Sequence, residues 1–61
     1  MYRKLIGIRN EMGYTQTDIA KVIGSSLKTY CCKEQGKTDF TVLEAKILMD
    51  FFKKTFDELF G

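Results

Sequence analysis

Apolar residues recur along this chain at helical spacing, in short stretches separated by glycine or by hydroxyl residues. The first stretch places Leu5, Ile8 and Met12 three and four residues apart, on one face of a helix that Gly13 ends. No stretch shows the strict alternation of a β-strand, so no sheet is predicted. The pattern predicts five short helices, over about residues 2–12, 16–23, 27–35, 42–52 and 56–60.

Hydroxyl and acidic residues mark where four of these helices begin. Three of them follow a threonine that has an acid three residues later, which is the pattern of a capping box, and the fourth follows a serine. The pairs are Thr15 with Asp18, Thr41 with Glu44 and Thr55 with Glu58, and the serine is Ser26.

Helices this short are not stable alone in water, so they must pack on one another. The chain has 61 residues, without an internal repeat or a linker, which is enough for one small domain. We therefore predict an all-α fold in which residues 1–61 form a single compact bundle of five helices. The expected core residues are Leu5, Ile8, Ile19, Ala20, Ile23, Tyr30, Leu48, Phe51 and Leu59.

Composition narrows the chemistry that the chain can perform. It has no histidine, and its only cysteines, Cys31 and Cys32, are adjacent, so neither a histidine base nor the separated ligands of a zinc site are available. A domain of this size has little room for a catalytic pocket. We expect no enzyme activity, metal, cofactor or small-molecule ligand. The absence of a long apolar run or a signal peptide indicates a cytoplasmic location.

Basic residues concentrate in the first part of the chain. Residues 1–38 have a net charge of +4, whereas residues 39–61 have a net charge of −2. A basic half beside an acidic half indicates a polyanionic partner such as nucleic acid, although chance scatter in a short chain is the alternative.

Residues 15–37 contain two predicted helices joined at Gly24. Ala20 precedes this glycine by four residues and is small enough to let the two helix backbones approach closely. Gly24 can adopt the positive φ that a tight turn requires. The arrangement is typical of a helix-turn-helix over about residues 16–35, and an ordinary helical hairpin needs the same small residue and glycine.

Several residues carry a family resemblance over most of the chain, from about residue 5 to residue 60. They are Arg9, the Gly-x-Thr-Gln of residues 13–16, the Ile-Ala pair 19–20, Gly24, Tyr30, the Glu-x-Gly of residues 34–36 and the Thr-Phe-Asp-Glu-Leu-Phe of residues 55–60. At their matching spacing the sequence resembles the phage-repressor and Cro-type helix-turn-helix family. The resemblance implies a lambda-repressor-like bundle that binds double-stranded DNA as a homodimer, with its third helix in the major groove.

The resemblance also implies which residues contact DNA. Gln16 is expected to hold a phosphate oxygen at the start of the second helix, and the loop after the third helix is expected to follow the DNA backbone. Lys28 is expected to donate to O6 or N7 of guanine, or to a phosphate. The implied DNA-binding positions are Gln16, Ser26, Leu27, Lys28, Thr29, Cys32, Lys37 and Thr38.

Some positions on the third helix leave alternatives open. Leu27 stands where the family often has a polar residue, and it either contacts a thymine methyl group or packs against the first or second helix. Cys31 and Cys32 are either two reduced small side chains, with Cys32 facing DNA, or a redox switch in which oxidation of Cys32 blocks the DNA-facing surface. Lys33 replaces a residue that is large and apolar in many members of the family.

Two further contacts follow from the resemblance and from the aromatic residues near the C-terminus. Arg9 and Glu34 match family positions that form a structural ion pair between the first and third helices. The phenylalanines indicate an exposed apolar patch that serves as a dimer surface. We expect this dimer interface to contain Phe52, Phe56 and Phe60.

We therefore expect a sequence-specific double-stranded DNA-binding transcriptional regulator. It would be a small Cro-like repressor of phage or prophage origin, acting as a homodimer on a near-palindromic operator. The alternative is a protein-interaction module of the same fold, such as an antitoxin or an anti-repressor. A redox or metal sensor that uses Cys31 and Cys32 is a further alternative.

Overall fold

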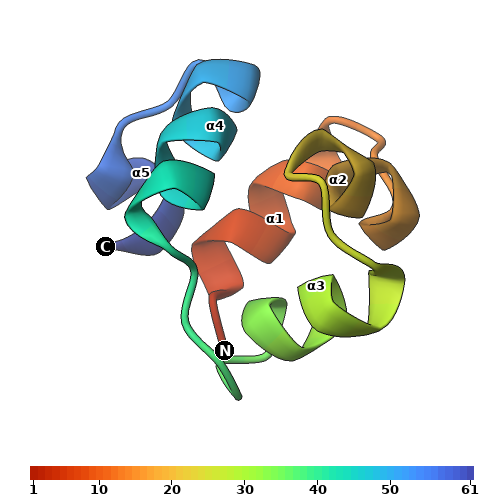
Figure 1. The fold of residues 1–61 in the computed structure, drawn as a ribbon. Helices are drawn as coiled ribbons and strands as arrows, with labels where there is room; N and C mark the ends of the chain where they lie inside the picture. Colours follow the sequence, from red (N-terminus) through yellow and green to blue (C-terminus); the bar gives the residue numbers. More distant parts are fainter.

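Five α-helices make up all the regular secondary structure of the computed structural model, which describes residues 1–61 (Figure 1). They are α1 (Arg3–Glu11), α2 (Gln16–Val22), α3 (Leu27–Glu34), α4 (Val42–Phe52) and α5 (Phe56–Phe60). The prediction of an all-α bundle of five helices is confirmed, and each predicted helix end lies within one residue of the observed one. The longest helix has 11 residues, and none is long and apolar enough to cross a membrane.

Side-chain caps hold the first turn of four of these helices, as the sequence pattern predicts. In α4, the backbone N–H of Glu44 donates to the hydroxyl of Thr41 at 3.1 Å, and the N–H of Thr41 donates to the Glu44 carboxylate at 3.0 Å. The helices α2 and α5 begin with the same reciprocal capping box. Ser26 caps α3 by accepting a hydrogen bond from the N–H of Thr29 at 3.2 Å. The helix ends are therefore specified locally.

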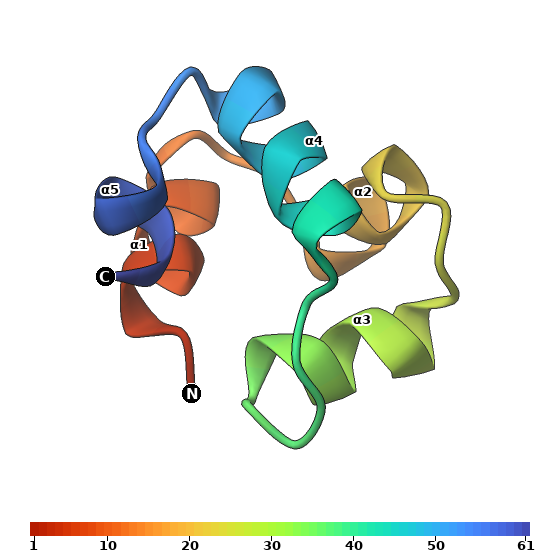
Figure 2. The ribbon, with the colours of Figure 1, turned by 60° about the vertical axis from the view of Figure 1, so that its left-hand side comes forward.

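The helices are arranged so that α3 has one side free. α1 packs beside α5, and α2 and α3 pack against each other (Figure 1). In the view turned by 60°, α3 again lies along the lower edge of the molecule with no other helix beneath it (Figure 2). The turn between α2 and α3 contains Gly24 at a φ of 72°, in the region that favours glycine.

One contiguous cluster of side chains forms the core: Leu5, Ile19, Ala20, Ile23, Tyr30, Leu48, Phe52 and Leu59. The prediction that Phe51 belongs to the core is wrong, because 38% of this side chain is exposed, whereas Phe52 is 3% exposed. Both residues continue the helical stripe that starts at Ala45 and Leu48, since steps of three and four residues both stay on one face. Ile8, also expected in the core, is half-buried against its edge.

The end of α4 holds a residue in an uncommon backbone conformation. Lys53, the C-cap of this helix, has φ 56° and ψ 47°, and it is the only residue other than glycine with a positive φ. Helices commonly end on a left-handed residue, and glycine adopts this conformation without the clash that a Cβ atom causes. A side chain at position 53 therefore costs stability.

We predict that Lys53→Gly raises the free energy of unfolding by about 0.5–1 kcal/mol. Relief of the left-handed strain, worth about 1–2 kcal/mol, exceeds the added entropy of the unfolded chain, worth about 0.4–1 kcal/mol. Urea denaturation followed by circular dichroism measures the change. Lys54→Gly is the matched control, because Lys54 has no positive φ, and it should destabilise the protein instead. Equal effects of the two changes would contradict this account of the α4 terminus.

Candidate nucleic-acid interface

The buried carboxylate of Glu34, the last residue of α3, connects three helices. Arg9 of α1 donates to both oxygens of Glu34, from Nε at 2.8 Å and from Nη2 at 3.1 Å. Tyr30 of α3 donates its hydroxyl to Oε2 at 2.6 Å, and Gln16 of α2 donates from Nε2 to Oε1 at 2.9 Å. Arg9 and Glu34 are 7% and 2% exposed, and no buried side-chain nitrogen or oxygen atom lacks a hydrogen-bond partner. This network fixes the orientation of α3 relative to α1 and α2.

The hydrogen bonds decide the charge of this carboxylate. Burial by itself raises the pKa of Glu34, but the bonds from Arg9, Tyr30 and Gln16, together with the Arg9 charge, outweigh it and hold the pKa below its ordinary value of 4.5. Burial and the adjacent Glu34 raise the pKa of Tyr30, so Tyr30 stays a neutral donor. A lowered folded-state pKa means that the stability gained from ionised Glu34 is present above pH 4.5 and is lost as the pH falls through the folded-state value.

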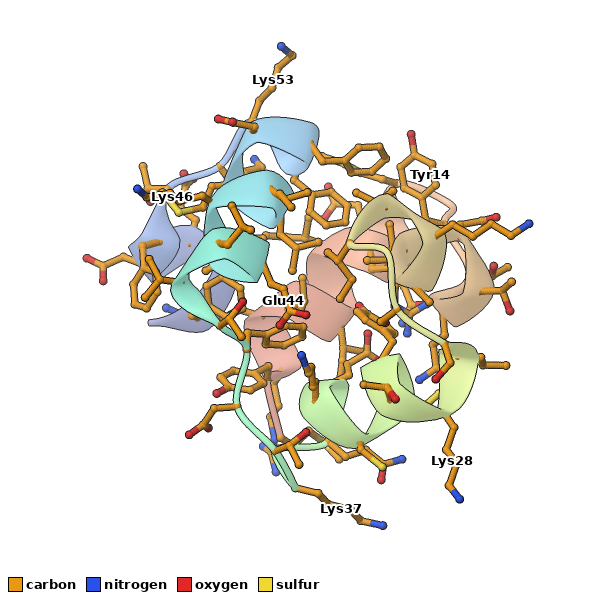
Figure 3. The ribbon with its side chains drawn as sticks, in the orientation of Figure 1. Tyr14, Lys28, Lys37, Glu44, Lys46 and Lys53 are labelled. Atoms are coloured by element: carbon orange, nitrogen blue, oxygen red, sulfur yellow. The ribbon has the colours of Figure 1, made fainter.

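With the buried side of α3 fixed in this way, its first turn lies in solvent. Leu27, Lys28 and Thr29 are all exposed. Lys28 projects from the first turn of α3 and Lys37 from the loop after it, and both point away from the body of the molecule on the same side (Figure 3). Lys46 and Lys53 lie at the other end of the molecule (Figure 3). Of the residues expected to contact DNA, Lys28, Thr29, Lys37 and Thr38 are all accessible.

The charge of this face has a single sign. Between residues 19 and 38 the chain contains one acid, Glu34, which is buried and paired with Arg9. The same stretch contains four lysines, of which Lys33 forms an ion pair with Glu44. Lys28 and Lys37 are exposed and form no ion pair, whereas exposed Lys21 lies on α2 near Asp18. A surface of this kind attracts anions over its whole length.

Two polar residues expected to contact phosphate already have partners within the protein. The hydroxyl of Ser26 accepts the capping bond and donates to Oγ1 of Thr29 at 2.9 Å. The hydroxyl proton of Thr29 is then left to donate outward. Gln16 uses one amide hydrogen for Glu34, which leaves its second amide hydrogen and its oxygen for an external partner. The sequence predicted the Ser26 cap, but it predicted neither the bond between the Ser26 and Thr29 hydroxyls nor the bond from Gln16 to Glu34.

The remaining predicted positions on α3 are less accessible. Cys31 and Cys32 are half-buried reduced thiols. Lys33 is half-buried, and its Nζ lies 2.5 Å from the carboxylate of Glu44 on α4. Burial raises the pKa of Glu44, but the bonds from Lys33 and from the Thr41 backbone outweigh it and lower the pKa overall. The stem of Lys33 thus replaces an apolar side chain while its charge joins α3 to α4. No group of three potential metal ligands occurs.

The expected dimer surface needs a correction. Phe52 is 3% exposed, so it belongs to the core and is not available to a partner. Phe56 is 54% exposed and Phe60 is half-buried. Sequence reasoning missed Val42 and Leu43, which are 75% and 68% exposed on the first turn of α4.

A shallow groove is lined by residues of α4, of α5, of the loop before α4 and of the N-terminal segment. It has a volume of about 270 Å³, and five hydrophobic residues line it: Tyr2, Phe40, Ala45, Phe56 and Phe60. We call Val42, Leu43, Phe56 and this groove the α4–α5 patch. Exposed large apolar side chains on neighbouring helices are typical of a protein-interaction site.

Comparisons of this chain with protein-family models, with curated proteins and with solved structures find no match. The geometry described above and the sequence resemblance therefore carry the functional argument.

We predict that Glu34→Gln lowers the free energy of unfolding by about 3–5 kcal/mol. The change keeps the shape of the side chain but leaves the buried Arg9 charge without its counterion. Urea denaturation at pH 7 measures the loss, which is a large part of the stability of a domain of this size.

Glu58→Gln is the matched control, since Glu58 is exposed and glutamine can also form a capping box. It should leave the free energy of unfolding nearly unchanged. The wild-type protein should also lose stability as the pH falls below 4.5, and Glu34→Gln should lose less over the same range. An equal pH dependence in both proteins would show that Glu34 is not the group that senses acid.

Proposed function

We propose that this protein is a sequence-specific DNA-binding regulator that places α3 in the major groove of a duplex. The single observation that carries the proposal is the face of α3 described above. It combines an exposed first turn with two exposed lysines that form no ion pair, Lys28 and Lys37, and no exposed acid between residues 19 and 38. The resemblance to phage-repressor and Cro-type proteins supports the same assignment, because it places its implied contacts on this same face.

The exposed residues have hydrogen-bond donors for both the base edges and the backbone phosphates of a duplex. Lys28 projects from the first turn of α3, and its ammonium can donate to O6 or N7 of guanine. Lys37 lies in the following loop, where a backbone phosphate is the natural partner (Figure 3). Thr29 and Gln16 each retain a donor that is not used inside the protein. Contacts to phosphate would set the position of the protein, and contacts to base edges would select the site.

We further propose that the protein acts as a two-fold dimer through the α4–α5 patch. A two-fold interface requires the same surface on both copies. The exposed Val42, Leu43 and Phe56, together with a groove that can receive the partner's side chains, offer such a surface on α4 and α5. In such a dimer the two α3 helices would contact successive major grooves about 34 Å apart on a near-palindromic operator. Binding there would block access of the polymerase to a promoter, which is repression by occlusion.

Selection of bound duplexes from a random pool, followed by a salt titration on the selected site, tests the proposal. Binding should weaken steeply with salt, because each phosphate contact releases counterions with a slope of about 0.9 in the logarithmic plot. Failure to select any duplex, together with a salt-insensitive complex with another protein, would support the alternative of a protein-interaction module.

We predict that Lys28→Ala weakens binding to the selected operator by about 1–3 kcal/mol and relaxes the preference at one base pair. Lys46→Ala is the matched control, because it removes the same charge from α4, where Lys46 lies away from α3 (Figure 3). The control should change affinity and site preference little. Fluorescence anisotropy with the operator and its single-base variants measures both quantities. Equal losses for the two variants would show that only net charge matters and would refute the role of Lys28.

We predict that Leu43→Gln raises the dissociation constant of the dimer at least tenfold without unfolding the protein. The buried leucine contributes about 1.5–3 kcal/mol, and it occurs twice in a two-fold interface. Met12→Gln is the control, because Met12 is also exposed, at 45%, but lies outside the α4–α5 patch. Sedimentation equilibrium measures the dimer. A dimer that tolerates Leu43→Gln but not Met12→Gln would place the interface elsewhere.

A further inference from the structure

Leu27 is an isolated apolar side chain on a polar surface. It is 47% exposed, and it is the only exposed large apolar residue between residues 15 and 41. The other exposed apolar side chains of the chain lie near α1 or on α4 and α5: Met1, Met12, Tyr14, Val42, Leu43, Phe51 and Phe56. Its sequence neighbours are Ser25, Ser26, Lys28 and Thr29, all polar. About half of the Leu27 side chain is therefore accessible to a partner.

The position of Leu27 is held firmly even though its side chain is free. It is the first residue of α3, directly after the Ser26 cap, and Ser26 is bonded twice to Thr29. Three residues further on, Tyr30 is fully buried and bonded to Glu34, which anchors the same turn to the core. Because its backbone is fixed, the Leu27 side chain can contact a partner only at a defined position.

We infer that Leu27 is a specificity-determining residue that contacts the C5-methyl group of a thymine in each operator half-site. The inference rests on the proposed function, since it assigns a chemical role within the same face of α3. Thymine is the only one of the four bases that presents an apolar group in the major groove. Leucine has neither a donor nor an acceptor, so against any other base edge it would bury a polar atom without a partner. The favourable contact with the methyl group and the cost of burying an unpartnered polar atom of another base therefore both favour thymine.

The expected size of the effect follows from burial of one methyl group. Removing a buried methyl group weakens binding about fourfold. Replacing the contacted thymine by a base that lacks only this methyl group, in both half-sites, should therefore weaken binding about fifteenfold. Deoxyuridine is the probe for this purpose, because it lacks only the C5-methyl group of thymine and keeps its base pairing and its O4 acceptor. The measured quantity is the ratio of dissociation constants for the deoxyuridine and thymine duplexes.

The experiment replaces each thymine of the selected operator with deoxyuridine in turn and measures binding by the wild-type protein, Leu27→Ala, Lys28→Ala and Leu43→Ala. The wild-type protein should show the ratio of about four at one thymine in each half-site. Leu27→Ala should bring this ratio close to one. Lys28→Ala and Leu43→Ala should weaken binding for other reasons and leave the ratio at its wild-type value. Circular dichroism confirms that each variant is folded.

The possible outcomes separate this inference from the function on which it rests. An operator that binds tightly but tolerates every deoxyuridine, or that contains no thymine in the half-sites, overturns the role of Leu27 and leaves DNA binding intact. A methyl dependence that persists in Leu27→Ala assigns the contact to another side chain and also overturns it. If no duplex is selected at all, the proposed function and this inference fail together.

Discussion

Three helices of this small protein are held in place by one buried carboxylate. Glu34 receives hydrogen bonds from Arg9 on α1, Gln16 on α2 and Tyr30 on α3, so its loss would disturb the whole arrangement around α3. The pair of Arg9 and Glu34 has well-formed bidentate geometry and neutralises both charges, which is the condition under which a buried ion pair is tolerated. Because these hydrogen bonds fix the buried side of α3, they also fix the direction in which its exposed face points.

Local features of the fold could be predicted from the sequence, because they depend on residues a few positions apart. Each threonine–acid pair forms the expected capping box, and Gly24 adopts the expected positive φ. The choice between Phe51 and Phe52 could not be predicted, since both fit the helical stripe and only the packing of α4 decides which one is buried.

The candidate site was predictable to a similar degree. The exposure of Lys28 follows from its place opposite Tyr30 on the same helix. The bond from Gln16 to Glu34 and the bond from Lys33 to Glu44 join residues 18 and 11 positions apart, and no local pattern announces them. The exposure of Val42 and Leu43 was missed for a different reason: apolar residues in a helical pattern are ordinarily assigned to the core.

The separation of charge along the chain has a consequence for how the molecule moves before it binds anything. The part from residue 1 to residue 38 has a net charge of +4 and the rest has −2, so the molecule has an electric dipole as well as a net charge. In the field of a polyanion, such a dipole rotates the molecule during diffusion. Because Lys28 and Lys37 are exposed on and just after α3, whereas four of the eight acids lie on α4 and α5, this rotation favours approach with α3 toward the polyanion.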